Sequence, residues 1–75
     1  IMNLSNLNIN KKAIIKYIDF HEIKKRRLYD LGFIPGKKKK KMYDSVFGSP
    51  SCYKVKDTFI ALRKEDAYKI EVSYE

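Results

Sequence analysis

Apolar and polar residues alternate in several short segments of the chain, and this pattern predicts β-strands. In residues 12–18, Ala13, Ile15 and Tyr17 would share one face of a strand. The opposite face is also largely apolar, so we expect this strand to be central in a sheet or curved within a barrel. Further strands are predicted toward the C-terminus, over residues 52–56, 58–63 and 70–74.

The apolar positions change to helical spacing in residues 21–31, which predicts one α-helix with Asp19 as its N-cap. The apolar residues that would form its buried face are Phe20, Ile23, Leu28 and Leu31. Arg27 falls within that face, so we expect it to be structural, with its stem along the core and its guanidinium bound to oxygen atoms. A short helical turn is predicted over residues 64–67.

Residues 32–36 predict the end of this helix and a turn after it. Gly32 comes directly after Leu31 and is suited to the left-handed conformation that ends many helices. Phe33 would then fold back onto the last helical turn. Pro35 and Gly36 fit the central pair of a type II turn, because proline fixes φ at the first position and glycine supplies a positive φ at the second. A tight turn into a strand is therefore expected here.

Two segments outside these elements have distinctive compositions. At the N-terminus, Leu4 and Leu7 stand among asparagines, and we expect a short arm that packs both leucines on the core. Residues 37–42 are five lysines and a methionine. Without an alternating apolar face, this run favours an exposed edge strand whose lysines prevent edge-to-edge pairing. A functional basic strip and local disorder are the alternatives. Residues 44–51 are typical of a hairpin loop.

The composition predicts one small, mainly β domain over residues 1–75, with a core of limited size. Cys52 is the only cysteine, so no intrachain disulfide can form and a reducing compartment is expected. No run of 18 apolar residues and no signal-peptide pattern are present. Because Ile1 precedes Met2, we expect Met2 to be the natural start.

The formal net charge is +8, which permits attraction to nucleic acid, anionic lipid or an acidic protein. Lysines number 14 and arginines 3, and this ratio favours a solvated surface over bidentate phosphate recognition. Tyr17, Tyr43 and Tyr53 lie among basic residues, as they would in a single-strand nucleic-acid binder. Packing on strand faces is the favoured alternative for these tyrosines.

The residue types needed for catalysis are sparse. One histidine and one cysteine are present, with no nucleophile elbow, C-x-x-C pair or H-E-x-x-H motif. We therefore predict no enzymatic activity and no cofactor. His21, beside Asp19 and Glu22, and the lone Cys52 are candidates only for adventitious metal ligands, because a closed metal site needs three or four converging groups.

A set of residues spread over nearly the whole chain matches a family pattern: Leu4, Leu7, Arg27-Leu28-x-x-Leu31-Gly32-x-x-Pro35-Gly36, Phe47-Gly48-Ser49-Pro50, Ile60-Ala61-Leu62-Arg63, Ala67 and Ile70-x-Val72. In these residues the chain resembles the FeoA family of ferrous iron transport proteins. The resemblance implies an SH3-like β-barrel with an inserted helix. It also implies a small cytoplasmic accessory protein of FeoB, the GTP-hydrolysing membrane transporter of Fe(II).

The chain departs from the family pattern at four positions. Asn10 and Asp57 stand where glycine is usual, and both residue types tolerate turn conformations. Lys39 and Lys41 stand at inward strand positions that are usually apolar. Either their stems extend over the core or the register of the strand has shifted. The family has no agreed catalytic or metal-binding residues, so none is carried over.

The leading hypothesis is a binding module that docks on the transporter and reaches the membrane surface only through it. Lys38 and Lys40, with Val46 and Phe47 in the following loop, are the predicted partner-binding residues. Phe47 could instead fold over the barrel as a lid. The alternative function is a basic small barrel that binds nucleic acid, although no specific nucleic acid is expected. A small metal-binding enzyme or chaperone is the third hypothesis.

Overall fold

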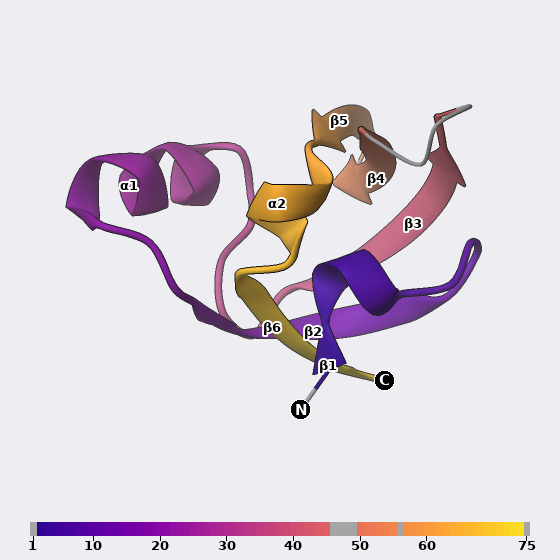
Figure 1. Ribbon diagram of the computed structural model, residues 1–75, viewed down its shortest axis with the longest axis horizontal. Helices are drawn as coiled ribbons and strands as arrows, with labels where there is room; N and C mark the ends of the chain where they lie inside the picture. Colours follow the sequence, from indigo (N-terminus) through magenta and orange to yellow (C-terminus); the bar gives the residue numbers. More distant parts are fainter. Residues whose placement is uncertain (1, 46–49, 56, 75) are drawn as a thin grey trace.

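In the computed structural model, the described residues (2–45, 50–55 and 57–74) form six strands, two α-helices and one 3₁₀-helix (Figure 1). In chain order these are β1 (Met2–Asn3), η1 (Leu4–Asn6), β2 (Lys12–Ile18), α1 (Glu22–Asp30), β3 (Lys38–Asp44), β4 (Ser51–Val55), β5 (Thr58–Leu62), α2 (Lys64–Ala67) and β6 (Ile70–Tyr74). The predicted mainly β class, with one inserted helix and a short helical turn, is confirmed.

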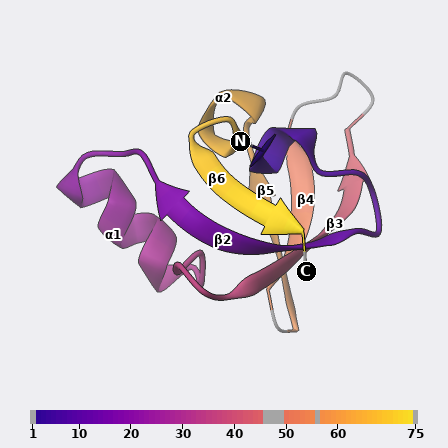
Figure 2. The same cartoon turned by 90° about the horizontal axis from the view of Figure 1, so that it is seen from below.

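The strands form a single antiparallel sheet in the order β1-β6-β2-β3-β4-β5. The sheet curves around the core (Figure 2). The first and last strands, β1 and β6, pair side by side near the two chain ends (Figure 1). The prediction of an edge position for the lysine-rich strand is wrong, because β3 pairs with β2 on one side and β4 on the other. Within the described sheet, the edges are β1 and β5.

Two lysines of β3 point into the molecule and explain how this strand can be central. Lys39 and Lys41 are only 5% and 6% exposed. The Lys39 ammonium donates a hydrogen bond to the carbonyl of Lys38 at 3.1 Å and lies 5.9 Å from the ring centroid of Phe33. The Lys41 ammonium lies 2.9 Å from a carboxylate oxygen of Asp44. The stems therefore fill inward positions while the charged ends reach oxygens or a ring face.

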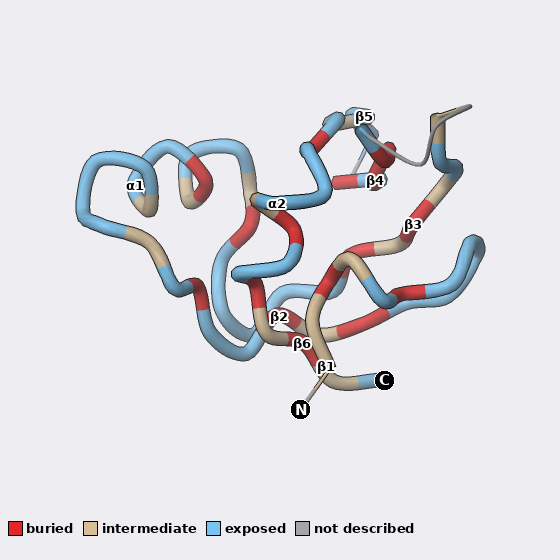
Figure 3. Tube along the Cα trace, viewed as in Figure 1, coloured by how far each residue is buried: buried red, intermediate tan, exposed pale blue. Residues whose placement is uncertain are grey.

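The core gathers apolar side chains from the sheet, the N-terminal arm and both helices. Figure 3 marks the buried positions in red along the trace. As predicted, Leu4 and Leu7 of the arm are buried. The rings of Phe33 and Tyr53 meet edge to face, with centroids 6.4 Å apart and planes at 86°. Asn10 has the left-handed backbone expected of a turn residue, with φ at 69°.

The stop after α1 is built as the sequence predicts. The amide of Phe33 donates to the carbonyl of Leu28, and that of Gly32 donates to Tyr29, each at 2.9 Å. These two bonds form a Schellman motif, with Gly32 at a φ of 101° and Phe33 fully buried behind it. Gly36 has a φ of 92°, and the amide of Lys37 donates to the carbonyl of Ile34 across the predicted turn.

The start of α1 and its buried face differ from the prediction. His21, not Asp19, is the N-cap, and it makes no side-chain capping bond. The prediction of a broad buried face is wrong, because Ile23 is 85% exposed, Leu31 is 39% exposed and Arg27 is also exposed. Leu28 alone is buried within the helix. The helix extends from the side of the sheet in both views, so only part of it meets the core (Figures 1 and 2).

Strand β2 contains an irregularity that changes which side chains face inward. Its register with β6 shifts between Ile15 and Tyr17. Ala13 and Ile15 are buried as predicted, but Tyr17 is 54% exposed and Ile18 is buried. The shared face predicted for Ala13, Ile15 and Tyr17 is therefore wrong beyond Ile15, because an extra residue in one strand reverses the alternation. In the described part of the chain, neither α-helix is long and apolar enough to cross a membrane.

Candidate docking surface

Four lysines occupy outward positions on three neighbouring interior strands, β2, β3 and β4. The pairing register places Lys12 opposite Lys40, and Lys40 opposite Lys54, while Lys38 lies opposite Ile14. Directly opposed residues of antiparallel strands share a face, with Cβ atoms about 4.5–5.5 Å apart. We call Lys12, Lys38, Lys40 and Lys54 the lysine face. It contains both lysines predicted from sequence as partner-binding residues, Lys38 and Lys40.

The lysine face surrounds an open hollow of about 320 Å³, which is lined by its four members and by Lys39. Neither β2 nor β4 contains an acidic residue, and the one carboxylate of β3 is that of Asp44, which is paired with Lys41. Positive charge is therefore concentrated on one side of the sheet. Such a surface attracts an extended anion rather than activating a substrate.

Two apolar side chains border the lysine face. Phe59 of β5 lies directly opposite Lys54 and is 57% exposed. Ile14 of β2 is half-buried opposite Lys38. Sequence reasoning missed Lys12, Lys54 and Phe59, because their alignment depends on pairing across four strands. One local signal was available: with Tyr53 and Val55 inward, Lys54 had to point outward.

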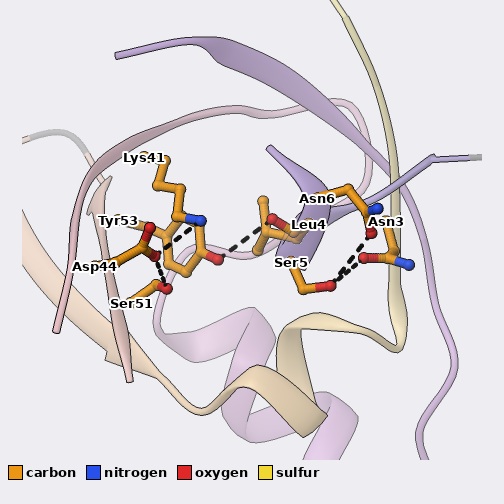
Figure 4. Close-up of polar contacts among 8 residues, drawn as sticks. All are labelled: Asn3, Leu4, Ser5, Asn6, Lys41, Asp44, Ser51 and Tyr53. Atoms are coloured by element: carbon orange, nitrogen blue, oxygen red, sulfur yellow. Dashed lines mark hydrogen bonds and ion pairs between the residues drawn. The ribbon is translucent and has the colours of Figure 1, made fainter. Parts of the chain in front are cut away.

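A polar network joins the end of β3 to the start of β4 (Figure 4). The Lys41 ammonium and the Ser51 hydroxyl both donate to the carboxylate of Asp44. The hydrogen bond from Ser51, reinforced by the one from Lys41, holds the pKa of Asp44 below its ordinary value. The ionised carboxylate therefore fixes the base of the loop between these strands.

The same view shows how Tyr53 ties the sheet to the N-terminal arm (Figure 4). Its hydroxyl donates a hydrogen bond to the carbonyl of Leu4 at 3.3 Å. Burial raises the pKa of Tyr53 to about 12, so the hydroxyl keeps its proton at neutral pH. Because Tyr53 is fully buried, it cannot form a stacking platform with the exposed Tyr17 and Tyr43.

The other two predicted partner-binding residues, Val46 and Phe47, lie outside the described residues. The described ends of their loop are joined by a hydrogen bond from the amide of Ser45 to the carbonyl of Pro50 at 3.1 Å. With the network of Asp44, this bond places the beginning and end of the loop beside each other. Docking by Val46 and Phe47 stays a prediction.

The two candidate metal ligands lie in different settings. His21 is exposed at the N-terminus of α1. Cys52 lies in β4 and is buried, whereas a half-buried position was expected from the sequence. Its hydrogen bond with Tyr43 raises the pKa of the Tyr43 phenol. Among the described residues, no three histidine, cysteine, aspartate or glutamate side chains gather as a metal site would require. The absence of tight metal binding stays a prediction.

Known proteins match this chain along nearly its whole length. The family model described as the FeoA domain matches residues 2–74. A protein of Campylobacter jejuni named as a putative Fe(2+) transport protein A is 33% identical over 72 residues, which are 96% of this chain and 97% of that protein.

A second relative, from Porphyromonas gingivalis, is named as a fusion of Fe(2+) transport protein A with the Fe(2+) transporter FeoB. It is 32% identical over 71 residues, which are 95% of this chain but only 8% of the length of the fusion protein. Among solved structures, zinc-complexed FeoA of Stenotrophomonas maltophilia, an SH3-domain protein, superposes with a TM-score of 0.82. It is 31% identical, with 97% of this chain and 91% of that chain covered. The predicted SH3-like fold is thereby confirmed.

Proposed function

Because the chain belongs to the FeoA family, we propose that it is a non-catalytic accessory protein of ferrous iron uptake that docks on the cytoplasmic side of a FeoB-type Fe(II) transporter. The fused relative from Porphyromonas gingivalis carries this proposal, because it joins a region similar to this chain with FeoB in one polypeptide. The Stenotrophomonas maltophilia neighbour, described as a candidate activating factor of ferrous iron transport, supports the accessory role.

The docking contacts that we propose are the lysine face and the loop that follows β3. Lys38 and Lys40 would steer the chain toward an acidic surface of the transporter, since charge complementarity acts mainly on the association rate. Phe47, with Val46, would supply apolar contact from the loop. The loop begins directly after the strand that carries both lysines, so one partner could meet both features.

A binding measurement on the transporter in uncharged detergent tests this proposal. Phe47→Ala should weaken docking with little change in melting temperature, whereas Ile23→Ala, on the exposed side of α1, is the matched control and should leave docking unchanged. Replacing Lys38 and Lys40 by glutamate should slow association, and more so at low ionic strength.

The lid interpretation of Phe47 makes the opposite prediction. In that case Phe47→Ala would lower the melting temperature by several degrees, and the folded variant would still dock normally. Absence of any docking by the unaltered chain would remove the proposed function itself.

A further inference from the structure

Three lysines stand in one row across neighbouring strands, in the order Lys12, Lys40 and Lys54. Like charges that lie directly opposite each other destabilise a sheet. Among the described residues, none of these three lysines has a carboxylate within ion-pair distance, since the described pairs join Lys24 with Asp66 and Lys41 with Asp44. The row is therefore unfavourable for folding, and an anion that covered it would offset the repulsion.

The shape of the row indicates what kind of anion would fit. Strands are about 4.8 Å apart, so the three side chains start along a line of roughly 10 Å. The hollow beside them is open and is lined by lysine alone. Lysine is a mobile point charge and lacks the planar fork with which arginine recognises one phosphate or carboxylate. Such a row responds to the density of negative charge on a surface, not to the geometry of a single group.

An aromatic residue ends the row. Phe59 follows Lys54 in the same cross-strand line and is more than half exposed. Beside a lipid bilayer, lysines would meet the headgroup phosphates while this ring entered the boundary with the acyl chains. A nucleic-acid strand would instead favour aromatic rings between the phosphate contacts, together with arginine. The row has neither of these features.

We propose that Lys12, Lys40 and Lys54, with Phe59 at their end, form a site for the surface of an anionic phospholipid bilayer. The site uses the same face of the sheet as the proposed docking and rests on that function only for bringing the chain beside a membrane. Contact with lipid would be direct, in addition to any contact made through the transporter.

Vesicle sedimentation without the transporter tests the site. The unaltered chain should bind vesicles in which a third of the lipid is phosphatidylglycerol, bind phosphatidylcholine vesicles far more weakly, and dissociate as salt rises. Lys12→Gln/Lys40→Gln/Lys54→Gln should lower the partition coefficient about 100-fold, since each lysine near an anionic surface contributes about one factor of five. Phe59→Ala should lower it several-fold with the salt dependence retained.

The matched control removes the same charge outside β2, β3 and β4, in Lys69→Gln/Arg26→Gln/Arg63→Gln, where all three side chains are exposed. It should bind nearly as well as the unaltered chain. An equal decrease of the partition coefficient in the control would show that only net charge matters and would overturn the site. Equal binding of the unaltered chain to both kinds of vesicle would also overturn it. Tighter binding to a mixed-sequence single-stranded DNA than to the anionic vesicles would also overturn it, in favour of nucleic acid.

Thermal melting of the triple variant and binding to the transporter in uncharged detergent are also measured. The triple variant of the row should melt at the same or a higher temperature, because like-charge repulsion is removed; a large decrease would contradict the repulsion inferred for the row. If the vesicles bind but the transporter in uncharged detergent does not, the proposed docking fails and the lipid site stands. The reverse result removes the lipid site alone.

Discussion

Gly32 is constrained twice at one residue. Its φ of 101° lies in the region that side chains disfavour, and a Cβ at this position would lie 2.5 Å from Cγ1 of Val55. Gly36 has a similar φ of 92°, but a Cβ there would have no atom within 4 Å. Substitution of Gly36 therefore measures the free-energy cost of the positive φ alone, whereas substitution of Gly32 adds the cost of the clash with Val55.

We predict that Gly32→Ala lowers the free energy of unfolding by about 2 kcal/mol or more, whereas Gly36→Ala costs about 1 kcal/mol. The difference should shrink when Gly32→Ala is combined with Val55→Ala, which removes the obstructing methyl. Urea denaturation of these three variants and of Val55→Ala alone measures these values. Equal stability of Gly32→Ala and the unaltered chain would exclude both constraints.

The inward direction of Lys39 and Lys41 was predictable, because side chains alternate along a strand and the family pattern places apolar residues there. Their partners were not. The turn after α1 places the ring of Phe33 against the Lys39 ammonium. The carboxylate of Asp44, at the end of the same strand, pairs with Lys41. Contacts of this kind depend on where a turn returns the chain, which periodicity does not specify.

At the scale of elements, α1 shows how periodicity can predict a helix but not its burial. Helical spacing correctly indicated a helix near residues 21–31, and Gly32 correctly ended it. The apolar stripe of a helix is buried only where another element covers it. Here Leu28 is covered and Ile23 is not, because the helix extends beyond the sheet.

This arrangement predicts an unequal effect of two similar substitutions in α1. Leu28→Ala should lower the free energy of unfolding by about 2–4 kcal/mol, because it leaves a cavity in the core. Ile23→Ala should change it by no more than about 0.5 kcal/mol, because the side chain is already in water. Chemical denaturation checks both; a comparable loss for Ile23→Ala would show that α1 has a covered face in solution.

The base of the β3–β4 hairpin should respond to acid. The pKa of Asp44 is lowered in the folded chain, so the carboxylate contributes stability above its unfolded pKa of about 3.9, and this contribution is lost as the pH falls through the lower folded value. Asp44→Asn should cost about 1–2 kcal/mol at pH 7, a reduced value because the Asp44 side chain is 35% exposed.

Urea midpoints measured between neutral pH and about pH 2 test this, with the cost of Asp44→Asn vanishing at the acid end. Asp57→Asn, which removes an exposed turn carboxylate, is the control. Its urea midpoint should change with pH in the same way as that of the unaltered chain. A difference for Asp44→Asn that stays constant with pH would mean that the charge of Asp44 does not stabilise the hairpin.

At the scale of the whole molecule, strand order was the feature that the sequence could not supply. The segments of β2, β4, β5 and β6 were recognised from their local apolar pattern, whereas β1 was expected only as part of an arm. The lysine-rich strand was assigned to an edge because its composition is that of many edge strands. Its central place results from pairing with β2 and β4, two segments that flank it at different distances along the chain. The same pairing creates the lysine face, so two of its four members, Lys12 and Lys54, were not identified from the sequence.

The net charge of +8 predicts weak binding to DNA of any sequence. At physiological salt the dissociation constant should be no tighter than roughly 10⁻⁴–10⁻⁶ M, and it should weaken steeply as salt increases, because the attraction comes from counterion release. A salt titration with two unrelated DNA duplexes measures both properties. Nanomolar binding that selects one sequence and persists at high salt would instead favour the nucleic-acid function.

The place of β6 has a consequence for how the chain acquires its fold during synthesis. Residues 70–74 pair with both β1 and β2, so the strand made last among the six described is the one that joins the first two. Until it leaves the ribosome, η1 with Leu4 lacks part of its cover and one side of β2 has unpaired amides. The sheet should therefore assemble only after translation of residue 74, in one step governed by contacts distant in sequence, and nascent chains that stop before residue 70 should depend on chaperones.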